Sequence, residues 1–163
     1  MTALRTALTG TFQILASCLA LLTLAACEAT DTPRGAVEMA GAAVQAGNVK
    51  LLRGYLSGAA DREFGSAEGL AELRREFAGP GELHLAKPQL IGRKLERSHQ
   101  FCISGFHPHD PYTRMTVSYH VPILRDQTPL RTADVDCHSC LHLDRHGYLL
   151  EQFPAECRIS ALH

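Results

Sequence analysis

The sequence predicts an α+β fold in which N-terminal helices pack on a curved antiparallel β-sheet. Apolar residues recur at helical spacing as far as Phe77, and the Gly79-Pro80-Gly81 run then interrupts the pattern. From Leu83 onward, apolar and polar residues alternate instead. Helices followed by consecutive strands are typical of α+β domains, because strands joined by short turns pair in antiparallel order.

Three helices are predicted before the glycine-proline stop, and each begins with a suitable capping side chain. Thr32 caps the first helix, Pro33 takes its first position, and Gly47 ends it. Asn48 caps the second helix, which closes at Gly58, and Ser66 caps the third. The predicted buried stripes are Val37, Ala40 and Val44; then Val49, Leu52, Tyr55 and Leu56; then Leu70, Leu73 and Phe77.

The strands are predicted from their alternation. One begins at Leu83 and resumes at Leu90, and another includes residues 101–103. Residues 115–121 have the pattern of a half-buried strand. Pro122 has no N–H to donate, so it predicts an edge, a bulge or the end of that strand.

Residues 135–143 predict a strand with two different faces. One face has Val135, Cys137, Ser139, Leu141 and Leu143, and the other has Asp136, His138, Cys140, His142 and Asp144. His146-Gly147 is a turn signal, after which residues 148–153 return as the hairpin partner. Residues 159–162 form a short final strand.

The N-terminal end has the features of a secretory signal. Arg5 supplies the positive charge, residues 14–24 form an apolar run, and Ala25-Ala26 are the small residues before Cys27. The run is too short to span a bilayer, which takes about 20 apolar residues. Leu24-Ala25-Ala26-Cys27 resembles the lipobox of bacterial lipoproteins. The alternative is a secretory signal that is cut without lipidation.

The lipoprotein resemblance implies cleavage before Cys27, transfer of a diacylglycerol to its thiol and acylation, as with palmitate, of the new amino group. Several acyl chains give stable membrane anchoring. Glu28 follows the modified residue. In enteric bacteria an Asp there favours inner-membrane retention, so the resemblance implies the outer membrane, facing the periplasm. The expected organisation is a signal peptide over 1–26, the lipidated Cys and a tether over 27–33, and one α+β domain over 34–163.

Composition argues against nucleic acid as a partner. The predicted signal contains one basic and no acidic residue, so its removal changes the net charge of the chain from −1 to −2. A chain without a basic run lacks the electrostatic attraction on which nucleic-acid binding depends.

The order of elements over residues 34–163 resembles the NTF2-like (cystatin-like) superfamily. Residues 42–52, with Gly47-Asn48 between two helices, are similar to the opening of small NTF2-like lipoproteins, although Asn48 stands where Asp is usual. Residues 156–162 are similar to their closing strand. The resemblance implies helices packed into a cone-shaped antiparallel sheet, and another α+β sandwich is the alternative.

Four cysteines remain after Cys18 leaves with the signal and Cys27 is lipidated: Cys102, Cys137, Cys140 and Cys157. An even number in an oxidising compartment predicts two disulfides. If the hairpin turns around His146-Gly147, the numbers of paired residues sum to about 293. Cys137 then lies opposite residue 156 or 157, which favours Cys137–Cys157 with Cys102–Cys140. The other pairing is Cys140–Cys157 with Cys102–Cys137.

All nine histidines lie between His84 and His163. His138 and His142 flank Cys140 on one predicted strand face, and His107 and His109 are close in sequence. Imidazole with thiolate is a ligand set for zinc or copper(I). A periplasmic metal-binding protein that uses these five residues is therefore an alternative function.

No spacing marks a catalytic residue, and the sequence has no nucleophile elbow or phosphate loop. Enzymes of the NTF2-like superfamily carry acid–base residues in the pocket, for which Tyr119, His120, Asp134 and Asp136 are the candidates here. A small NTF2-like enzyme is thus a second alternative. We expect instead a non-enzymatic envelope module without cofactor, which binds an envelope protein or a small apolar ligand.

Overall fold

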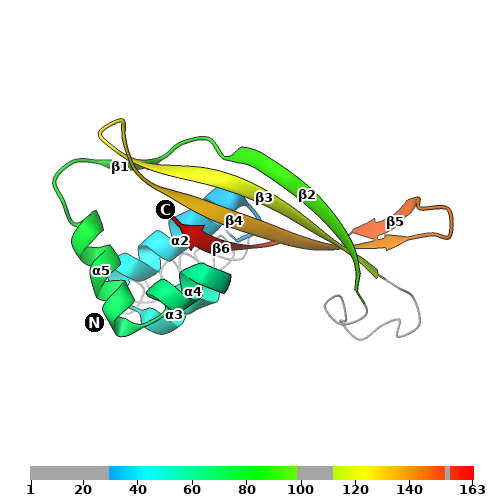
Figure 1. Ribbon diagram of the computed structural model, residues 1–163, viewed down its shortest axis with the longest axis horizontal. Helices are drawn as coiled ribbons and strands as arrows, with labels where there is room; N and C mark the ends of the chain where they lie inside the picture. The colour runs from blue at the N-terminus through cyan, green and yellow to red at the C-terminus, as the bar shows by residue number, and fades with distance from the viewer. Residues whose placement is uncertain (1–29, 99–111, 153–154) are drawn as a thin grey trace, which may run out of the picture.

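The computed structural model describes residues 30–98, 112–152 and 155–163 of the chain. In these ranges it has four helices and one six-stranded sheet, which confirms the α+β prediction. The sheet is curved, and the helices pack against one face of it at one end, while β5 and the adjoining ends of β2, β3 and β4 extend beyond them (Figure 1). The predicted signal peptide, Cys27 and the strand at 101–103 lie outside the described residues.

The strands are β1 (Leu83–Leu85), β2 (Gln89–Ser98), β3 (Tyr112–Arg125), β4 (Thr128–Leu143), β5 (Leu149–Gln152) and β6 (Glu156–Leu162). All pairings between them are antiparallel. β3 and β4 form the centre, with β1 and β2 on the outer side of β3 and with β5 and β6 on the outer side of β4. The turn predicted at His146-Gly147 is confirmed between β4 and β5, where Gly147 has a φ of 86°.

The helices are α2 (Pro33–Ala46), α3 (Val49–Tyr55), α4 (Gly58–Phe64) and α5 (Ala67–Phe77). The side chains of Thr32, Asn48 and Ser66 each accept a hydrogen bond from the backbone N–H three residues ahead, at 3.0, 3.0 and 3.1 Å. The three predicted N-caps are therefore confirmed. Gly47 ends α2 with a φ of 67°, which glycine adopts without the steric penalty of a Cβ.

The second helix does not close at Gly58, as the sequence predicted. α3 already ends at Tyr55, and Gly58 is the first residue of α4. Two contacts with the sheet explain this short helix. Ser57 N donates to Ile159 O of β6 at 2.8 Å, which fixes its start, and Phe64 at its last turn is fully buried. Tertiary packing therefore stabilises a segment that is too short to be stable alone.

β3 continues through Pro122 to Arg125, so the strand does not end at the proline. Pro122 O accepts a hydrogen bond from Ala86 N at 2.9 Å, in the segment that joins β1 to β2. Because the N and the carbonyl of one residue point to the same side of a strand, the missing N–H faces this segment. Pro122 therefore removes no hydrogen bond from the central β3–β4 pair.

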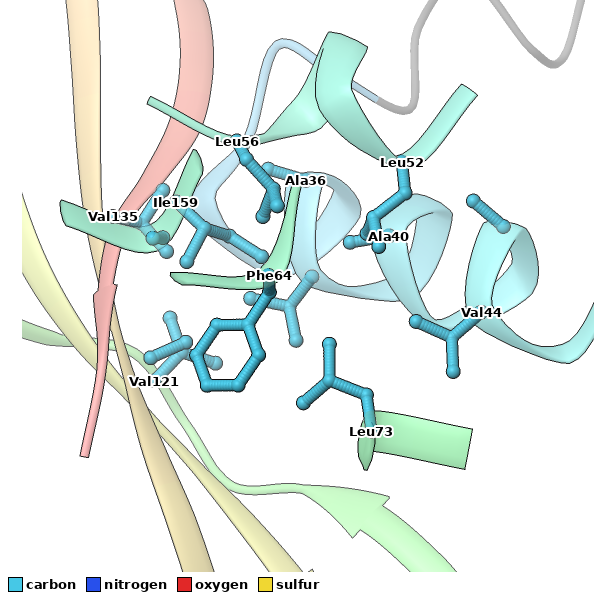
Figure 2. Packing of buried hydrophobic residues seen from close by; sticks show 14 of the residues in the cluster. Ala36, Ala40, Val44, Leu52, Leu56, Phe64, Leu73, Val121, Val135 and Ile159 are labelled. Carbon is cyan, nitrogen blue, oxygen red and sulfur yellow. The ribbon is translucent and has the colours of Figure 1, made fainter. Parts of the chain in front are cut away.

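The core lies between the helices and the sheet face that they cover (Figure 2). The predicted helical stripes are confirmed. Their members are buried except Val49, Tyr55 and Phe77, which are partly buried and pack against the same cluster. From the sheet, the cluster includes Val121, Val135 and Ile159. None of the helices in the described part of the chain is long and apolar enough to span a membrane.

Candidate binding groove

A cavity of about 500 Å³ lies between α2 and β1. Its apolar floor belongs to the core, with side chains from α2, α3, α5, β3 and β6. The floor residues are Val37, Ala40, Val44, Leu52, Leu56, Leu73, Ile123 and Ile159. Sites for small molecules typically have volumes of about 300–1,000 Å³ and mostly apolar walls with a few polar groups. The cavity has both properties.

One stripe of α2 forms the long wall of the cavity. Arg34, Glu38, Gly41 and Gln45 all line it, at spacings of three or four residues that place them in a row on the helix. With a rise of 1.5 Å per residue, the distance from Arg34 to Gln45 is about 16 Å. The cavity is therefore elongated, and we call it the α2–β1 groove.

Gly41 leaves the middle of this wall open. A Cβ at position 41 would have no heavy atom within 4 Å, although the residue is in the interior of α2. Glycine costs an interior helical position about 0.5–1 kcal/mol relative to alanine. The missing side chain therefore widens the groove at the expense of helix stability.

β1 forms the opposite wall. Leu85 is paired with Ile123, whose side chain is buried in the core, so Leu83 and Leu85 share the face that points to the groove. The backbone N–H of Glu82 donates to Asp126 Oδ1 at 2.9 Å, and Asp126 N donates to Glu82 O at 3.1 Å. These bonds hold the start of β1 against the β3–β4 turn.

The rim of the groove is polar and has both signs of charge. Arg34 Nε lies 2.7 Å from Glu38 Oε1, and both side chains are about half exposed. Glu82 and Gln45 complete the rim. His84 also lines the groove, but the alternation of β1 places its side chain on the face opposite to Leu83 and Leu85. We therefore assign it no role in the groove.

None of the predicted acid–base candidates lines the groove, and Tyr119 is partly buried and packs against the core. On β3 and β4, the outer polar face consists of Thr116, Ser118, His120, Asp134, Asp136 and His138. It is the sheet face opposite to the buried Val117, Val121 and Val135.

Hydrogen bonds across the strands join the outer polar face into pairs. His120 Nδ1 lies 2.6 Å from Asp134 Oδ1, and His163 Nε2 lies 2.9 Å from Asp134 Oδ2. Ser118 Oγ donates to Asp136 Oδ1 at 2.5 Å. The candidates His120, Asp134 and Asp136 therefore interact with other side chains of the sheet, on the side away from the groove.

His138 belongs to the same face. Its Nδ1 lies 2.9 Å from Thr116 Oγ1, its register partner on β3. Partial burial lowers the pKa of His138 below its usual value, and the positive charge of Arg114 lowers it further. The neutral imidazole is thus the form that this environment favours.

The predicted Cys137–Cys157 disulfide is confirmed. β4 and β6 place the two residues directly opposite each other, with their Cα atoms 3.9 Å apart. Both side chains are buried. Cys140 is also disulfide-bonded, and its predicted partner Cys102 lies outside the described residues.

The residues of the metal-site alternative are only partly described. His107 and His109 lie outside the described ranges. Cys140 is held in a disulfide, so it has no thiolate to offer a metal. Among residues 30–98, 112–152 and 155–163, no group of three His, Cys, Asp or Glu side chains is arranged to hold an ion.

Sequence reasoning did not identify the groove. It assigned Val37, Ala40 and Val44 to a buried stripe but made no statement about the adjacent row with Arg34, Gly41 and Gln45. The available signal was a small residue, Gly41, that lies between polar residues in the row beside that stripe. Comparison with protein-family models, with curated proteins and with solved structures gave no match for this chain.

Proposed function

We propose that this protein is a membrane-anchored envelope lipoprotein whose folded domain is a non-enzymatic binding module. The α2–β1 groove is its ligand site. The observation that carries this proposal is an elongated cavity of about 500 Å³ with an apolar floor and a polar rim. Such a site retains an apolar ligand by burial and leaves a polar end in water.

Sequence and disulfide chemistry support the proposed location. Leu24-Ala25-Ala26-Cys27 supplies the lipid attachment site, and Glu28 favours the outer membrane, facing the periplasm. The Cys137–Cys157 disulfide and the bonded Cys140 suit an oxidising compartment. The helices on a curved antiparallel sheet are compatible with the NTF2-like architecture that we propose for the domain.

The arrangement of the polar residues favours binding over catalysis. The groove has aliphatic side chains on its floor and charged groups only at its rim. His120, Asp134 and Asp136 interact with other side chains on the opposite face of the sheet. A reaction in the groove would lack these acid–base groups.

The anchor is tested with labelled palmitate in bacterial cells that express the full chain. We expect the wild type to incorporate the label and to fractionate with membranes. Cys27→Ser should lose the label, because it has no thiol to carry the diacylglycerol. Label retained by Cys27→Ser would refute lipidation at this residue.

The groove is tested with anilinonaphthalene sulfonate, which fluoresces in apolar sites. The protein is the chain from residue 27 with Cys27→Ser, which keeps the whole core because the described core cluster lies between Ala36 and Ile159. Gly41→Phe should abolish the fluorescence increase by filling the groove. Gly54→Phe is the control, since Gly54 is also helical with open space at its Cβ but does not line the groove. Equal dye binding by both variants would overturn the proposed site.

A further inference from the structure

We infer that the α2–β1 groove binds one acyl chain of a single-chain lipid, with the lipid head at the polar rim. This inference rests on the proposed function and names the ligand of the same site. Length is the first observation that carries it. The α2 wall extends about 16 Å from Arg34 to Gln45. One leaflet of a bilayer has half of a hydrocarbon core of about 30 Å, so an extended lipid chain has nearly the same length.

The shape of the groove selects one flexible chain. Ala40, Gly41 and Ala42 are small residues that all line the groove near the middle of α2, and aliphatic residues of β1 and β6 line it too. An elongated apolar groove with small residues near its middle fits a methylene chain along its length. A compact aromatic ligand would cover only part of the wall.

The rim discriminates little between lipid head groups of different charge. Arg34 is paired with Glu38, and Glu82 adds a second carboxylate. A carboxylate head therefore meets attraction and repulsion together, in contact with water. Since exposed ion pairs contribute little, a fatty acid and a fatty alcohol of equal length should bind within about fivefold of each other.

The ligand that we infer is a free lipid and not the protein's own anchor. Thr30 lies three residues after Cys27, and its carbonyl accepts a hydrogen bond from Cys157 N at 3.1 Å. Cys157 does not line the groove. The backbone that follows the proposed anchor is therefore hydrogen-bonded to a residue of β6 that does not line the groove.

The test measures displacement of anilinonaphthalene sulfonate by saturated fatty acids from octanoate to stearate, below their micelle concentrations. The protein is again the chain from residue 27 with Cys27→Ser. We expect affinity to rise about fourfold for each added methylene, because each buried methylene gains a similar transfer free energy. The rise should stop near myristate, where the groove is filled. Gly41→Phe should abolish displaceable binding, and Gly54→Phe should preserve the series.

The outcomes separate the two proposals. Gly41-dependent dye binding without displacement by any fatty acid would overturn the acyl-chain inference and leave the binding module intact. An affinity that still rises up to stearate would also overturn it, because the chain is then not confined by the groove. Lack of dye binding to the wild type would refute the proposed function itself. A further outcome is that the dye binds the unlipidated chain but not the lipidated one, and that fatty acids do not displace it. That outcome would identify the anchor as the occupant of the groove and refute a free lipid.

Discussion

The turn between β3 and β4 places two residues in backbone conformations that favour glycine. Asp126 has a φ of 47° and Gln127 a φ of 72°. Two-residue hairpin turns of this kind most often have Asn-Gly or Asp-Gly, because a Cβ is strained at positive φ. Asp126 is held by its bonds to Glu82, whereas Gln127 is exposed to solvent.

We expect Gln127→Gly to raise the free energy of unfolding by about 0.5 kcal/mol, as relief of strain exceeds the entropy cost of glycine. Urea unfolding measures this change. Thr128→Gly is the control: Thr128 has no positive φ, so glycine there should lower stability by a similar amount. A lower stability for Gln127→Gly would show that the turn is not strained at this position.

His138 gives the second prediction for single residues, a dependence of stability on pH. Because its environment lowers the pKa of His138, the unfolded chain binds the proton more readily than the folded one. The stabilising contribution is complete above the unfolded pKa, near 6.5, and is lost as pH falls through the lower folded pKa. The folded protein should therefore lose stability as pH falls below about 6.5.

His138→Gln should make the decrease in unfolding free energy between neutral and mildly acidic pH shallower. Urea unfolding at a series of pH values measures the slope. His146→Gln is the matched control, since His146 lies exposed in the β4–β5 turn. If His138→Gln and the wild type have the same slope, other groups account for the pH dependence.

At the scale of single elements, two serines precede helices but differ in their bonds. Ser66 Oγ accepts a hydrogen bond from Gly69 N at the start of α5, whereas the Ser57 side chain forms no cap bond at the start of α4. Ser66→Ala should lower the free energy of unfolding by about 1 kcal/mol, the usual cost of a lost N-cap.

Ser57→Ala is the same chemical change and should cost less. Its hydroxyl donates only a long bond of 3.4 Å to Ile159 O. Thermal and urea unfolding of both variants give the comparison. Equal costs would mean that the capping bond contributes little to α5.

The Cys137–Cys157 disulfide joins β4 to β6 and closes a loop with a sequence separation of 20. Replacing both residues with alanine should lower the free energy of unfolding by about 3 kcal/mol, mainly because the unfolded chain gains freedom. Alanine is chosen because both positions are buried and serine would bury a hydroxyl. Urea unfolding under oxidising conditions measures the loss while the bond of Cys140 stays intact. A loss below about 1 kcal/mol would contradict the prediction.

Local chemistry made several of these elements predictable. Thr32, Asn48 and Ser66 are caps whose bonds reach only three residues, so the sequence alone indicates them. The pairing of Cys137 with Cys157 followed from one turn and the regular spacing of strands. α4 was missed because its start depends on Ser57 bonding to β6, about 100 residues away in the chain.

At the scale of the whole molecule, the groove depends on how the layers meet. Its walls and floor come from α2, α3, α5, β1, β3 and β6, which lie between residues 34 and 162. Periodicity identifies which residues are apolar, but not where two apolar surfaces fail to fill the space between them. The groove therefore could not be predicted before the helices were placed on the sheet.

Polar contacts contribute to that placement, and one of them joins the sheet to two helices. Arg131 of β4 donates through Nε to both carboxylate oxygens of Glu76 in α5, at 2.9 and 2.8 Å. Its guanidinium also lies 5.4 Å from the centre of the Phe64 ring in α4. The hydrogen bond to Glu76 raises the pKa of Arg131. One side chain thus joins the sheet to two helices.

Arg131→Met keeps most of the side-chain volume but removes the charge. We expect it to lower the free energy of unfolding by about 1.5 kcal/mol, since the pair is largely shielded from water. Arg53→Met is the control, because Arg53 and Asp61 form an ion pair between two helices in which the arginine is 60% exposed. That variant should cost less than about 0.5 kcal/mol. Urea unfolding measures both. If the two costs are equal, the Arg131–Glu76 pair contributes no more than an exposed ion pair, and the placement of the helices on the sheet does not depend on Arg131.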